Sequence, residues 1–307
     1  MWRSMKLPLR LGTRGSPLAL TQARMVSAAL RAAHGWGDGD IEIVPIRTSG
    51  DRIQDRPLAE VGGKALWTKE LDRALIDGEI DFAVHSMKDV ETIRPREIVI
   101  AAMLPRADVR DRLIGAESLD ALPERARIGT ASPRRSAQLL RLRPDFVIVL
   151  FRGNVDTRLS RLDLGEAEAT LLAAAGLDRL GRPEIGVPIP IETMLPAPAQ
   201  GAVGIETLAA RDDVKTLLAA IDDADTSLCV RTERALLAAL GADCRSPVAA
   251  LAVRDGQGLW LRAEILREDG REHEAGEARI SRPEDAAALA RTLLDRASPT
   301  LRAHFTG

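Results

Sequence analysis

The chain has 307 residues, of which 45% are hydrophobic and 29% charged, and its formal net charge is −2. This length predicts two or three domains, and the near-neutral charge argues against a general nucleic-acid binder, which needs a basic excess. Two cysteines cannot form a disulfide framework, and no run approaches the roughly 20 apolar residues of a membrane span. We therefore expect a cytoplasmic protein without a nucleic-acid or membrane partner.

The first third of the chain alternates strand and helix signals. A strand is predicted at 7–13, followed by a helix over 16–35 with Ser16 as N-cap, Pro17 at the first helical position and a glycine after its end. The remaining predicted elements here are strands at 40–48, 79–85 and 96–104 and a helix over 64–78. This order is typical of an α/β fold with a mostly parallel sheet.

The same pattern then starts again. A strand at 125–130 precedes a helix over 132–143, and a buried strand at 145–151 precedes a loop at 152–157. The stretches "GTRGSP" (12–17) and "GTASP" (129–133) each end a strand with Gly-Thr and open a helix with Ser-Pro. Each therefore places a helix N-terminus at the carboxyl end of a strand, which is where α/β sheets bind anions.

The last third changes composition. The Pro-rich segment 192–206 is expected to cross between lobes, with 202–206 returning to the first sheet. From Asp222 a long helix, several strands and a closing helix over 283–297 predict a small α+β domain. We thus expect a first domain of 1–103 and 200–221, a second domain of 104–199 and a third domain of 222–307.

The segment "DFAVHSMKDV" (81–90) is the strongest candidate for chemistry. An apolar strand ends at His85, and Ser86, Lys88 and Asp89 follow it. A carboxylate beside an ammonium group can stay ionised and hold or relay protons. The alternative is a solvated turn with a surface Lys–Asp pair of little energetic value.

Basic side chains form the second candidate group. Arginine is the usual cation of this chain, which has only five lysines, so arginines scattered over the surface are the alternative interpretation. Several of them nevertheless follow predicted strand ends, where guanidinium forks suit carboxylates or phosphates. These candidates for a polyanionic ligand are Arg14, Lys64, Arg134, Arg135, Arg152 and Arg158.

The two cysteines differ in their surroundings. Cys229 has apolar neighbours at helical spacing, which predicts a core residue. Cys244 lies in a polar turn beside Asp243 and Arg245, where a nearby cation favours the reactive thiolate. The residues alone leave Cys244 open between a turn residue and a nucleophile. No Cys/His cluster at metal-binding spacing occurs, and no metal site is predicted.

Together these motifs resemble the porphobilinogen deaminase (hydroxymethylbilane synthase) family, in the family's order and over nearly the whole chain. The stretches that carry the resemblance are "GTRGSPLAL", "VGGKALWTKEL", "DFAVHSMKDV", "IGTASPRRSAQL", "FRGNVDTRL", "AAAGLDRLG", "PAQGAVGIE" and the C-x-x-P that begins at Cys244. The resemblance implies two hinged lobes similar to periplasmic binding proteins plus the small third domain. It also implies a monomer that condenses four porphobilinogens head to tail, with loss of ammonia, and hydrolytically releases hydroxymethylbilane for tetrapyrrole biosynthesis.

The resemblance also implies roles for individual residues. Cys244 matches the cysteine that carries a covalent dipyrromethane cofactor, and Asp89 matches the catalytic acid. The other implied cofactor-binding residues are Lys88, Asp89, Ser132, Arg134 and Arg135. The implied substrate-binding residues are Arg14, Ser16, Lys64, Thr130, Arg152, Arg158, Arg179 and Gln200.

Two other functions use part of the same pattern. A non-catalytic two-lobed anion-binding or ligand-sensing protein needs the arginines but neither Cys244 nor Asp89. A cysteine hydrolase needs a histidine directed at Cys244. The sequence also departs from the family pattern, with Trp67 in place of phenylalanine, Glu91 and Pro133 in other loop positions, and Ala242-Asp243 in place of two glycines.

Overall fold

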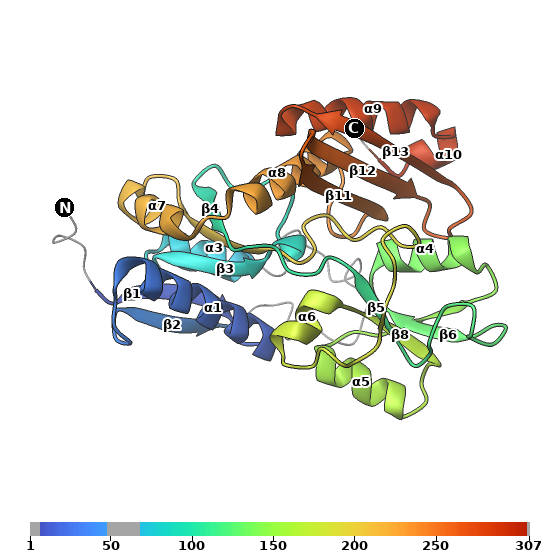
Figure 1. Ribbon diagram of the computed structural model, residues 1–307, viewed down its shortest axis with the longest axis horizontal. Helices are drawn as coiled ribbons and strands as arrows, with labels where there is room; N and C mark the ends of the chain where they lie inside the picture. The colour runs from blue at the N-terminus through green and yellow to red at the C-terminus, as the bar shows by residue number, and fades with distance from the viewer. Residues whose placement is uncertain (1–6, 48–67, 306–307) are drawn as a thin grey trace. The chain divides into compact units, whose positions relative to one another are not determined.

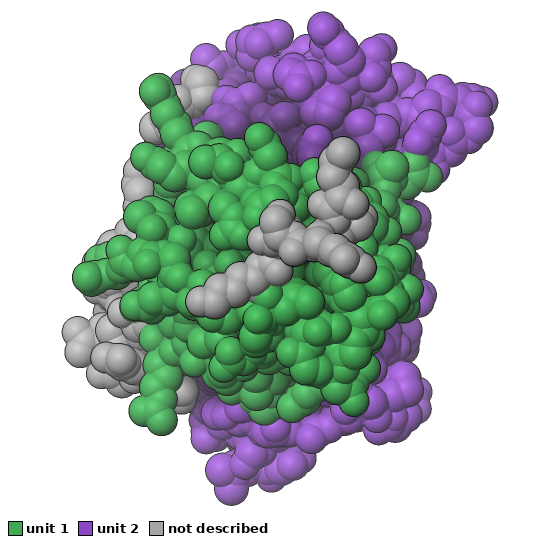
Figure 2. Space-filling view, turned by 90° about the vertical axis from the view of Figure 1, so that its left-hand side faces the viewer, with its two compact units in different colours: residues 1–53, 63–107, 202–227 green, residues 54–62, 108–201, 228–307 purple. Residues whose placement is uncertain are grey.

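The structure is a computed structural model that describes residues 7–47 and 68–305. These residues divide into two compact units, coloured separately in Figure 2. The first unit contains 7–47, 68–107 and 202–227, and the second contains 108–201 and 228–305. Lys64, Trp67 and the predicted helix start at 64 lie outside the described residues. Over the two described ranges, no helix combines the length and the apolar character needed to cross a membrane.

The first unit is built on a five-stranded sheet. Its strands, in spatial order, are β2 (Ile41–Ile46), β1 (Leu9–Arg14), β3 (Phe82–Ser86), β10 (Val203–Leu208) and β4 (Ile98–Met103). β1 pairs in parallel with β2 and β3, whereas β10 runs antiparallel to both β3 and β4. The expected return of 202–206 to the first sheet is therefore confirmed, and it separates β3 from β4.

The helices of the first unit are α1 (Pro17–His34), α3 (Lys69–Ile76) and α7 (Asp212–Leu218), with 3-10 turns η1 (Met87–Asp89) and η2 (Ala219–Ile221). The Ser16 side chain accepts a hydrogen bond from the Ala19 N–H, Pro17 occupies the first turn, and Gly35 ends α1 in the left-handed region at φ 68°. The predicted boundaries of α1 are confirmed because local capping chemistry determines them.

The second unit contains a sheet with the same arrangement. Its strands, in spatial order, are β7 (Val147–Leu150), β6 (Arg127–Thr130), β8 (Ala169–Ala173), β5 (Asp111–Ile114) and β9 (Val187–Pro188). β6 is parallel to β7 and β8, and β5 is antiparallel to β8 and β9. Its helices are α4 (Pro133–Leu142), α5 (Val155–Asp163) and α6 (Ala174–Arg179). Figure 1 shows α4, α5 and α6 around this sheet.

Two predictions for this sheet are wrong. The strand predicted as buried, 145–151, contains β7, which is an edge strand with Val147 40% and Leu150 39% exposed. The predicted loop 152–157 contains the start of α5, because the Asn154 side chain accepts a hydrogen bond from the Thr157 N–H at 2.9 Å and caps that helix.

The rest of the second unit is an antiparallel sheet with helices. Strands β11 (Val248–Asp255), β12 (Gly258–Leu266) and β13 (His273–Ile280) follow each other in sequence and in space. The accompanying helices are α8 (Ala224–Ala239), whose first residues fall in the first unit, α9 (Ala286–Arg296) and α10 (Pro299–Arg302), with η3 (Pro283–Asp285). One apolar core joins these strands to α8, α9 and α10, and it includes Cys229 at 6% exposure.

The α/β class is confirmed by these two similar sheets, and the α+β character of the last third is confirmed by its antiparallel sheet and helices. The boundaries of the three predicted domains and the hinge between two lobes stay predictions.

Candidate active site

The carboxyl ends of β1 and β3 meet at one edge of the first sheet, because the two strands are parallel neighbours. β1 ends at Arg14, and Ser16 caps α1 directly after it. β3 ends at Ser86 and continues into η1, which carries Lys88 and Asp89. The structure therefore brings these four predicted site residues to a single edge of this sheet.

The segment with Lys88 and Asp89 has a defined backbone. The Met87 N–H donates to the Ala202 carbonyl at 3.1 Å, and the Val90 N–H donates to the Met87 carbonyl at 3.2 Å. The side chains of Ser86 and Gln22 are hydrogen-bonded, with 2.8 Å from Gln22 Nε2 to Ser86 Oγ. Lys88 and Asp89 are half-buried, so their charges act at lower dielectric than on an open surface.

In the second unit the predicted residues lie at the carboxyl ends of β6, β7 and β8, which are mutually parallel. Thr130 is the last residue of β6, and its Oγ1 accepts a hydrogen bond from the Ser132 N–H at 3.2 Å. Ser132 caps α4 by accepting a hydrogen bond from the Arg135 N–H at 3.4 Å. Arg152 lies two residues after β7, Arg158 lies in the first half of α5, and Arg179 is the last residue of α6. Arg152 therefore lies near the same carboxyl ends of the strands as the N-terminus of α4, and the other two arginines belong to the helices that follow β7 and β8.

Gly153 and Gly201 shape the backbone near these arginines. Gly153 has φ 107°, which glycine adopts readily, and its carbonyl accepts a hydrogen bond from Arg158 Nε at 3.1 Å. The Gly201 carbonyl accepts a hydrogen bond from Arg179 Nη2 at 2.7 Å. Backbone carbonyls thus orient two guanidinium groups without neutralising their charge.

Arg134 and Arg135 meet a carboxylate that the sequence analysis did not identify. Asp111, at the start of β5, is fully buried; its Oδ2 lies 2.8 Å from Arg134 Nη2 and its Oδ1 lies 2.7 Å from Arg135 Nη2. Gln200 Nε2 donates to the same Oδ1 at 3.0 Å. Asp111 therefore brings three of the predicted binding residues together.

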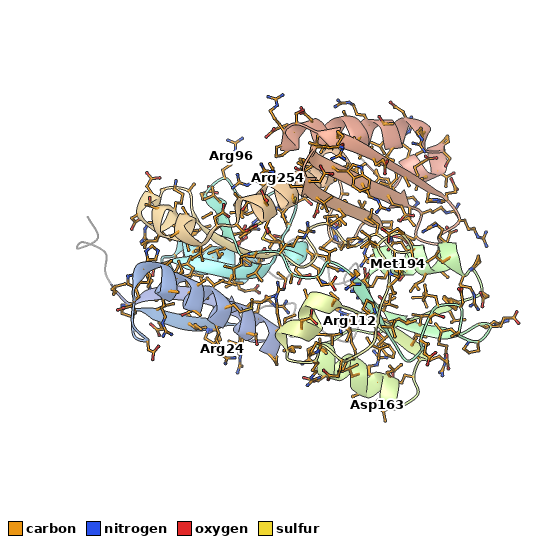
Figure 3. The ribbon with its side chains drawn as sticks, viewed as in Figure 1. Arg24, Arg96, Arg112, Asp163, Met194 and Arg254 are labelled. Atoms are coloured by element: carbon orange, nitrogen blue, oxygen red, sulfur yellow. The ribbon has the colours of Figure 1, made fainter. Side chains whose placement is uncertain are left out.

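The next residue of β5, Arg112, serves a different contact because successive strand residues point to opposite faces. Its guanidinium lies 3.0 Å from the Asp178 carboxylate of α6. Arg112 is labelled in Figure 3. The alternation separates this structural ion pair from the group formed by Asp111, Arg134 and Arg135.

The charges of that group do not balance. Two guanidinium groups face the Asp111 carboxylate, and Glu264, which also acts on Arg134, is paired with Arg141 at 3.0 Å. Three arginines thus accompany two carboxylates. Burial lowers the pKa of Arg134 and also that of Arg179, although Asp111 acts in the opposite direction on Arg134. Among the described residues, the Nε atoms of Arg134 and Arg179 are buried without a hydrogen-bond partner. An anionic ligand group would satisfy both the charge and donors of this kind.

Cys244 lies in the turn between α8 and β11, and it is exposed. Asp243 and Ser246 hold the turn, since the Asp243 N–H donates to Ser246 Oγ at 3.1 Å and the Ser246 N–H donates to the Asp243 carbonyl at 3.0 Å. Arg245 Nη2 lies 2.7 Å from Asp243 Oδ2. The turn presents the thiol outward between two paired charges.

Three charged residues whose side chains are buried near these sites were missed by the sequence analysis: Asp111, Arg94 and Glu206. Glu206 is 0% exposed in the centre of β10. The available signal was a single acid inside the apolar run "AVGIETL", because an isolated carboxylate in a buried strand needs a partner.

The fold and these side chains define a class of protein: an α/β protein with arginines and helix N-termini near the carboxyl ends of its parallel strands and with an exposed cysteine. Residues 9–216 match the family model described as porphobilinogen deaminase, dipyromethane cofactor binding domain, and residues 227–297 match porphobilinogen deaminase, C-terminal domain. The chain belongs to the porphobilinogen deaminase family.

Two curated relatives support this membership. The porphobilinogen deaminase of Sphingopyxis alaskensis is 58% identical over 306 residues, covering 97% of this chain and 96% of the relative. That of Paracoccus denitrificans is 51% identical over 294 residues, covering 94% and 93%. Among solved structures, a periplasmic substrate-binding protein of an ABC transporter from Coxiella burnetii has a TM-score of 0.44 at 14% identity, covering 71% of this chain and 94% of that one.

The activity is accordingly that of a transferase of tetrapyrrole biosynthesis. It condenses four porphobilinogens head to tail on a dipyrromethane primer, releases ammonia at each addition, and hydrolyses off linear hydroxymethylbilane. The expected family, reaction, substrate and cofactor are confirmed, and the non-catalytic binding protein is not supported.

Proposed function

We propose that Asp89 is the acid of this reaction and that Cys244 is the residue that anchors the primer. The observation that carries the proposal is the position of Asp89 at the carboxyl end of β3, half-buried beside Lys88 on the hydrogen-bonded segment. A carboxylate held in this way can accept hydrogen bonds from pyrrole N–H groups of the substrate. It can also stabilise the positive charge that develops on the substrate as ammonia departs.

Exposure distinguishes the two thiols. Cys244 is exposed, whereas Cys229 lies in the apolar core of the last sheet. Arg245 is the nearest cation in sequence, and its guanidinium is held by Asp243, which keeps a positive charge on the turn that carries the thiol. The dipyrromethane group, once attached through a thioether, supplies the carbon to which the first substrate is joined.

The arginines fit the side chains of such a group. Each pyrrole of the substrate and primer carries an acetate and a propionate, so a growing chain is a polyanion. The positive charge left over by Asp111 and the buried Nε atoms of Arg134 and Arg179 match that chemistry. We propose that Arg134, Arg135, Ser132 and Lys88 hold the primer. The proposed substrate-binding residues are Arg14, Ser16, Lys64, Thr130, Arg152, Arg158, Arg179 and Gln200.

Intact-mass measurement tests the anchor. Protein expressed in cells that make porphobilinogen should carry the mass of a dipyrrole, and Cys244→Ser should lose it. Cys229→Ser is the matched control and should retain the added mass, because its side chain lies in the core. A bare polypeptide mass in the unaltered protein, or an adduct that persists in Cys244→Ser, would contradict the assignment.

Steady-state turnover tests the acid. Asp89→Asn keeps the shape of the side chain but removes its negative charge, so we expect turnover to fall by about 10²-fold or more while the dipyrrole mass remains. Near-normal turnover in Asp89→Asn would remove Asp89 from the mechanism.

We further propose that the enzyme acts as a cytoplasmic monomer. The two cysteines form no disulfide, which is consistent with a reducing compartment, and a formal net charge of −2 does not favour a nucleic-acid partner. Light scattering at micromolar concentration should give a mass near 33.2 kDa, and twice that mass would contradict the monomer.

A further inference from the structure

The segment that carries Lys88 and Asp89 is held at both ends by one carboxylate, that of Glu206. Before the segment, His85 Nε2 lies 3.2 Å from Glu206 Oε2. After it, Arg94 Nε lies 2.8 Å from Oε1 and Arg94 Nη2 lies 2.9 Å from Oε2. Glu206 belongs to β10, the antiparallel neighbour of β3. A single buried side chain therefore joins the start and the end of the loop to the middle of the sheet.

Arg94 is the centre of this arrangement. Besides Glu206, its guanidinium contacts the Asp72 carboxylate of α3, and Nη1 lies 2.7 Å from Glu91 Oε2. Glu91 in turn accepts a hydrogen bond from Thr68 Oγ1 at 2.6 Å. The rigid fork of arginine can bind several carboxylates in fixed directions, which a lysine ammonium cannot do.

The partners of Glu206 and Arg94 favour the charged form of each group. Burial by itself would raise the pKa of Glu206, but His85 and Arg94 lower it to about 2. Burial would likewise lower the pKa of Arg94, whereas Glu206 and Asp72 raise it above its ordinary value. At neutral pH the segment is thus joined to the sheet by a full ion pair in a buried setting, where directional contacts are strong.

The middle of the segment is also held against β10. Met87 is 1% exposed, and a Cβ added at Gly204 of β10 would lie 2.0 Å from its sulfur. Met87 therefore packs directly on the β10 backbone two residues before Glu206. Backbone contact, side-chain packing and the ion pair all fix the residues on either side of Lys88 and Asp89.

A buried ion pair is weak evidence for stability, because desolvation of the charges offsets their attraction. Its geometric effect is more specific: it defines where the ends of a loop lie. We propose that Glu206 and Arg94 are positioning residues, which hold Lys88 and Asp89 in the geometry required for condensation. This inference rests on the proposed role of Asp89.

The proposal predicts that substitutions of Glu206 or Arg94 lower the turnover of the molecules that do fold. Glu206→Gln removes the charge that Arg94 needs, and Arg94→Lys keeps the positive charge but loses the fork. A displacement of about 1 Å at reacting groups can cost about 10²-fold in rate. We therefore expect both variants to lower kcat by about 10- to 100-fold with KM changed by less than about threefold. Leu217→Ala in α7 of the same unit is the control, since it creates a cavity in the apolar core and should keep its turnover per folded molecule.

The test uses primer-loaded enzyme, with the loaded fraction measured by intact mass and the folded fraction by thermal unfolding. Glu206→Gln is also combined with Asp89→Asn. If Glu206 acts through the segment of Asp89, adding Glu206→Gln to Asp89→Asn should lower turnover by less than about twofold further, because residues that act as a unit are not additive.

Normal kcat per folded molecule in both Glu206→Gln and Arg94→Lys would overturn the inference and leave the role of Asp89 intact. An equal loss from Glu206→Gln with and without Asp89→Asn would also overturn it. Near-normal turnover in Asp89→Asn alone is a different failure, because it removes the proposed acid itself and with it the reason to position it. If Glu206→Gln does not fold, Arg94→Lys decides by the same criteria.

Discussion

The two five-stranded sheets share one strand order, yet the groups of charged side chains packed against them differ in the sign of their excess charge. In the first sheet, Arg94 and His85 face the carboxylates of Asp72, Glu91 and Glu206. In the second sheet, one carboxylate, Asp111, faces Arg134 and Arg135. The three carboxylates of the first group contact every nitrogen of the Arg94 guanidinium, whereas in the second group the arginines outnumber the carboxylate. In the roles that we propose, the same scaffold serves positioning in one unit and anion binding in the other.

The largest effect should come from removing the single acid of the second sheet. Asp111→Asn leaves two buried guanidinium groups without their counterion, so the free energy of unfolding should fall by about 3–5 kcal/mol. Urea unfolding measures this change. Asp178→Asn is the control: its carboxylate pairs with Arg112 but its side chain is 37% exposed, so we expect a loss near 1 kcal/mol. Equal losses would show that burial of the charge does not matter.

In the first sheet, the contribution of Glu206 to the free energy of unfolding should depend on pH. Glu206 has a pKa of about 2 against an ordinary value of 4.5. Its contribution to stability is therefore present above about pH 4.5 and is lost as the pH falls toward 2. The full difference corresponds to roughly 3 kcal/mol. We expect the stability advantage of the unaltered protein over Glu206→Gln to shrink over that range in unfolding experiments.

Asp72 provides a control of opposite sign for this titration. Burial raises its pKa, with Arg94 acting against that shift. Its contribution to stability is thus present at low pH and is lost as the pH rises through its folded-state pKa. The difference between the unaltered protein and Asp72→Asn should move the other way as the pH falls. Parallel curves for the two variants would contradict the assigned charges.

Alanine substitutions at one glycine in an inner strand of each sheet should have smaller effects, which can be compared between the two units. A Cβ at Gly204 would lie 2.0 Å from the Met87 sulfur, and a Cβ at Gly129 would lie 2.4 Å from the Phe151 ring. Each alanine variant should lose about 1–3 kcal/mol by overpacking. Gly204→Ala should mainly lower kcat, because Met87 precedes Lys88. Gly129→Ala should mainly raise KM, because Phe151 precedes Arg152. The same kinetic pattern in both variants would break the proposed division of roles.

Loss of the N-cap serine should have nearly the same effect on unfolding free energy at the two Ser-Pro helix starts. Ser16→Ala and Ser132→Ala each remove one capping hydrogen bond, so each should cost about 1 kcal/mol in unfolding free energy. Thr21→Ala is the control within α1, since its hydroxyl donates only to the Pro17 carbonyl on the exposed face, and we expect a change within about 0.5 kcal/mol. A much larger loss at one serine than at the other would show that the two helix starts are not equivalent.

Local chemistry made part of the fold predictable. Ser16 with Pro17 and Ser132 with Pro133 define two helix starts, and the apolar run before His85 defines β3. The candidate residues after those elements then follow from the geometry of parallel strands. The exposure of β7 was not predictable in this way, because an edge strand and a central strand of equal hydrophobicity look alike in sequence.

Contacts between distant residues were the part that sequence patterns could not supply. Arg94 and Glu206 are separated by 112 positions, and Gln200 and Asp111 by 89. No periodicity links such residues, so Arg134 and Arg135 were assigned to ligand binding without the carboxylate that orients them. A charged residue inside an apolar run was the one available sign, at Glu206.

The late position of β10 in the chain has a consequence for how the enzyme is made. Residues 108–201 of the second unit are synthesised before Val203–Leu208, which lie between β3 and β4 in the first sheet. Until those six residues leave the ribosome, the nascent first unit lacks both the antiparallel neighbour of β3 and the carboxylate of Glu206. Domains generally complete their folding as units during synthesis. The loop of Asp89 therefore cannot reach its final form until about two thirds of the polypeptide has been translated.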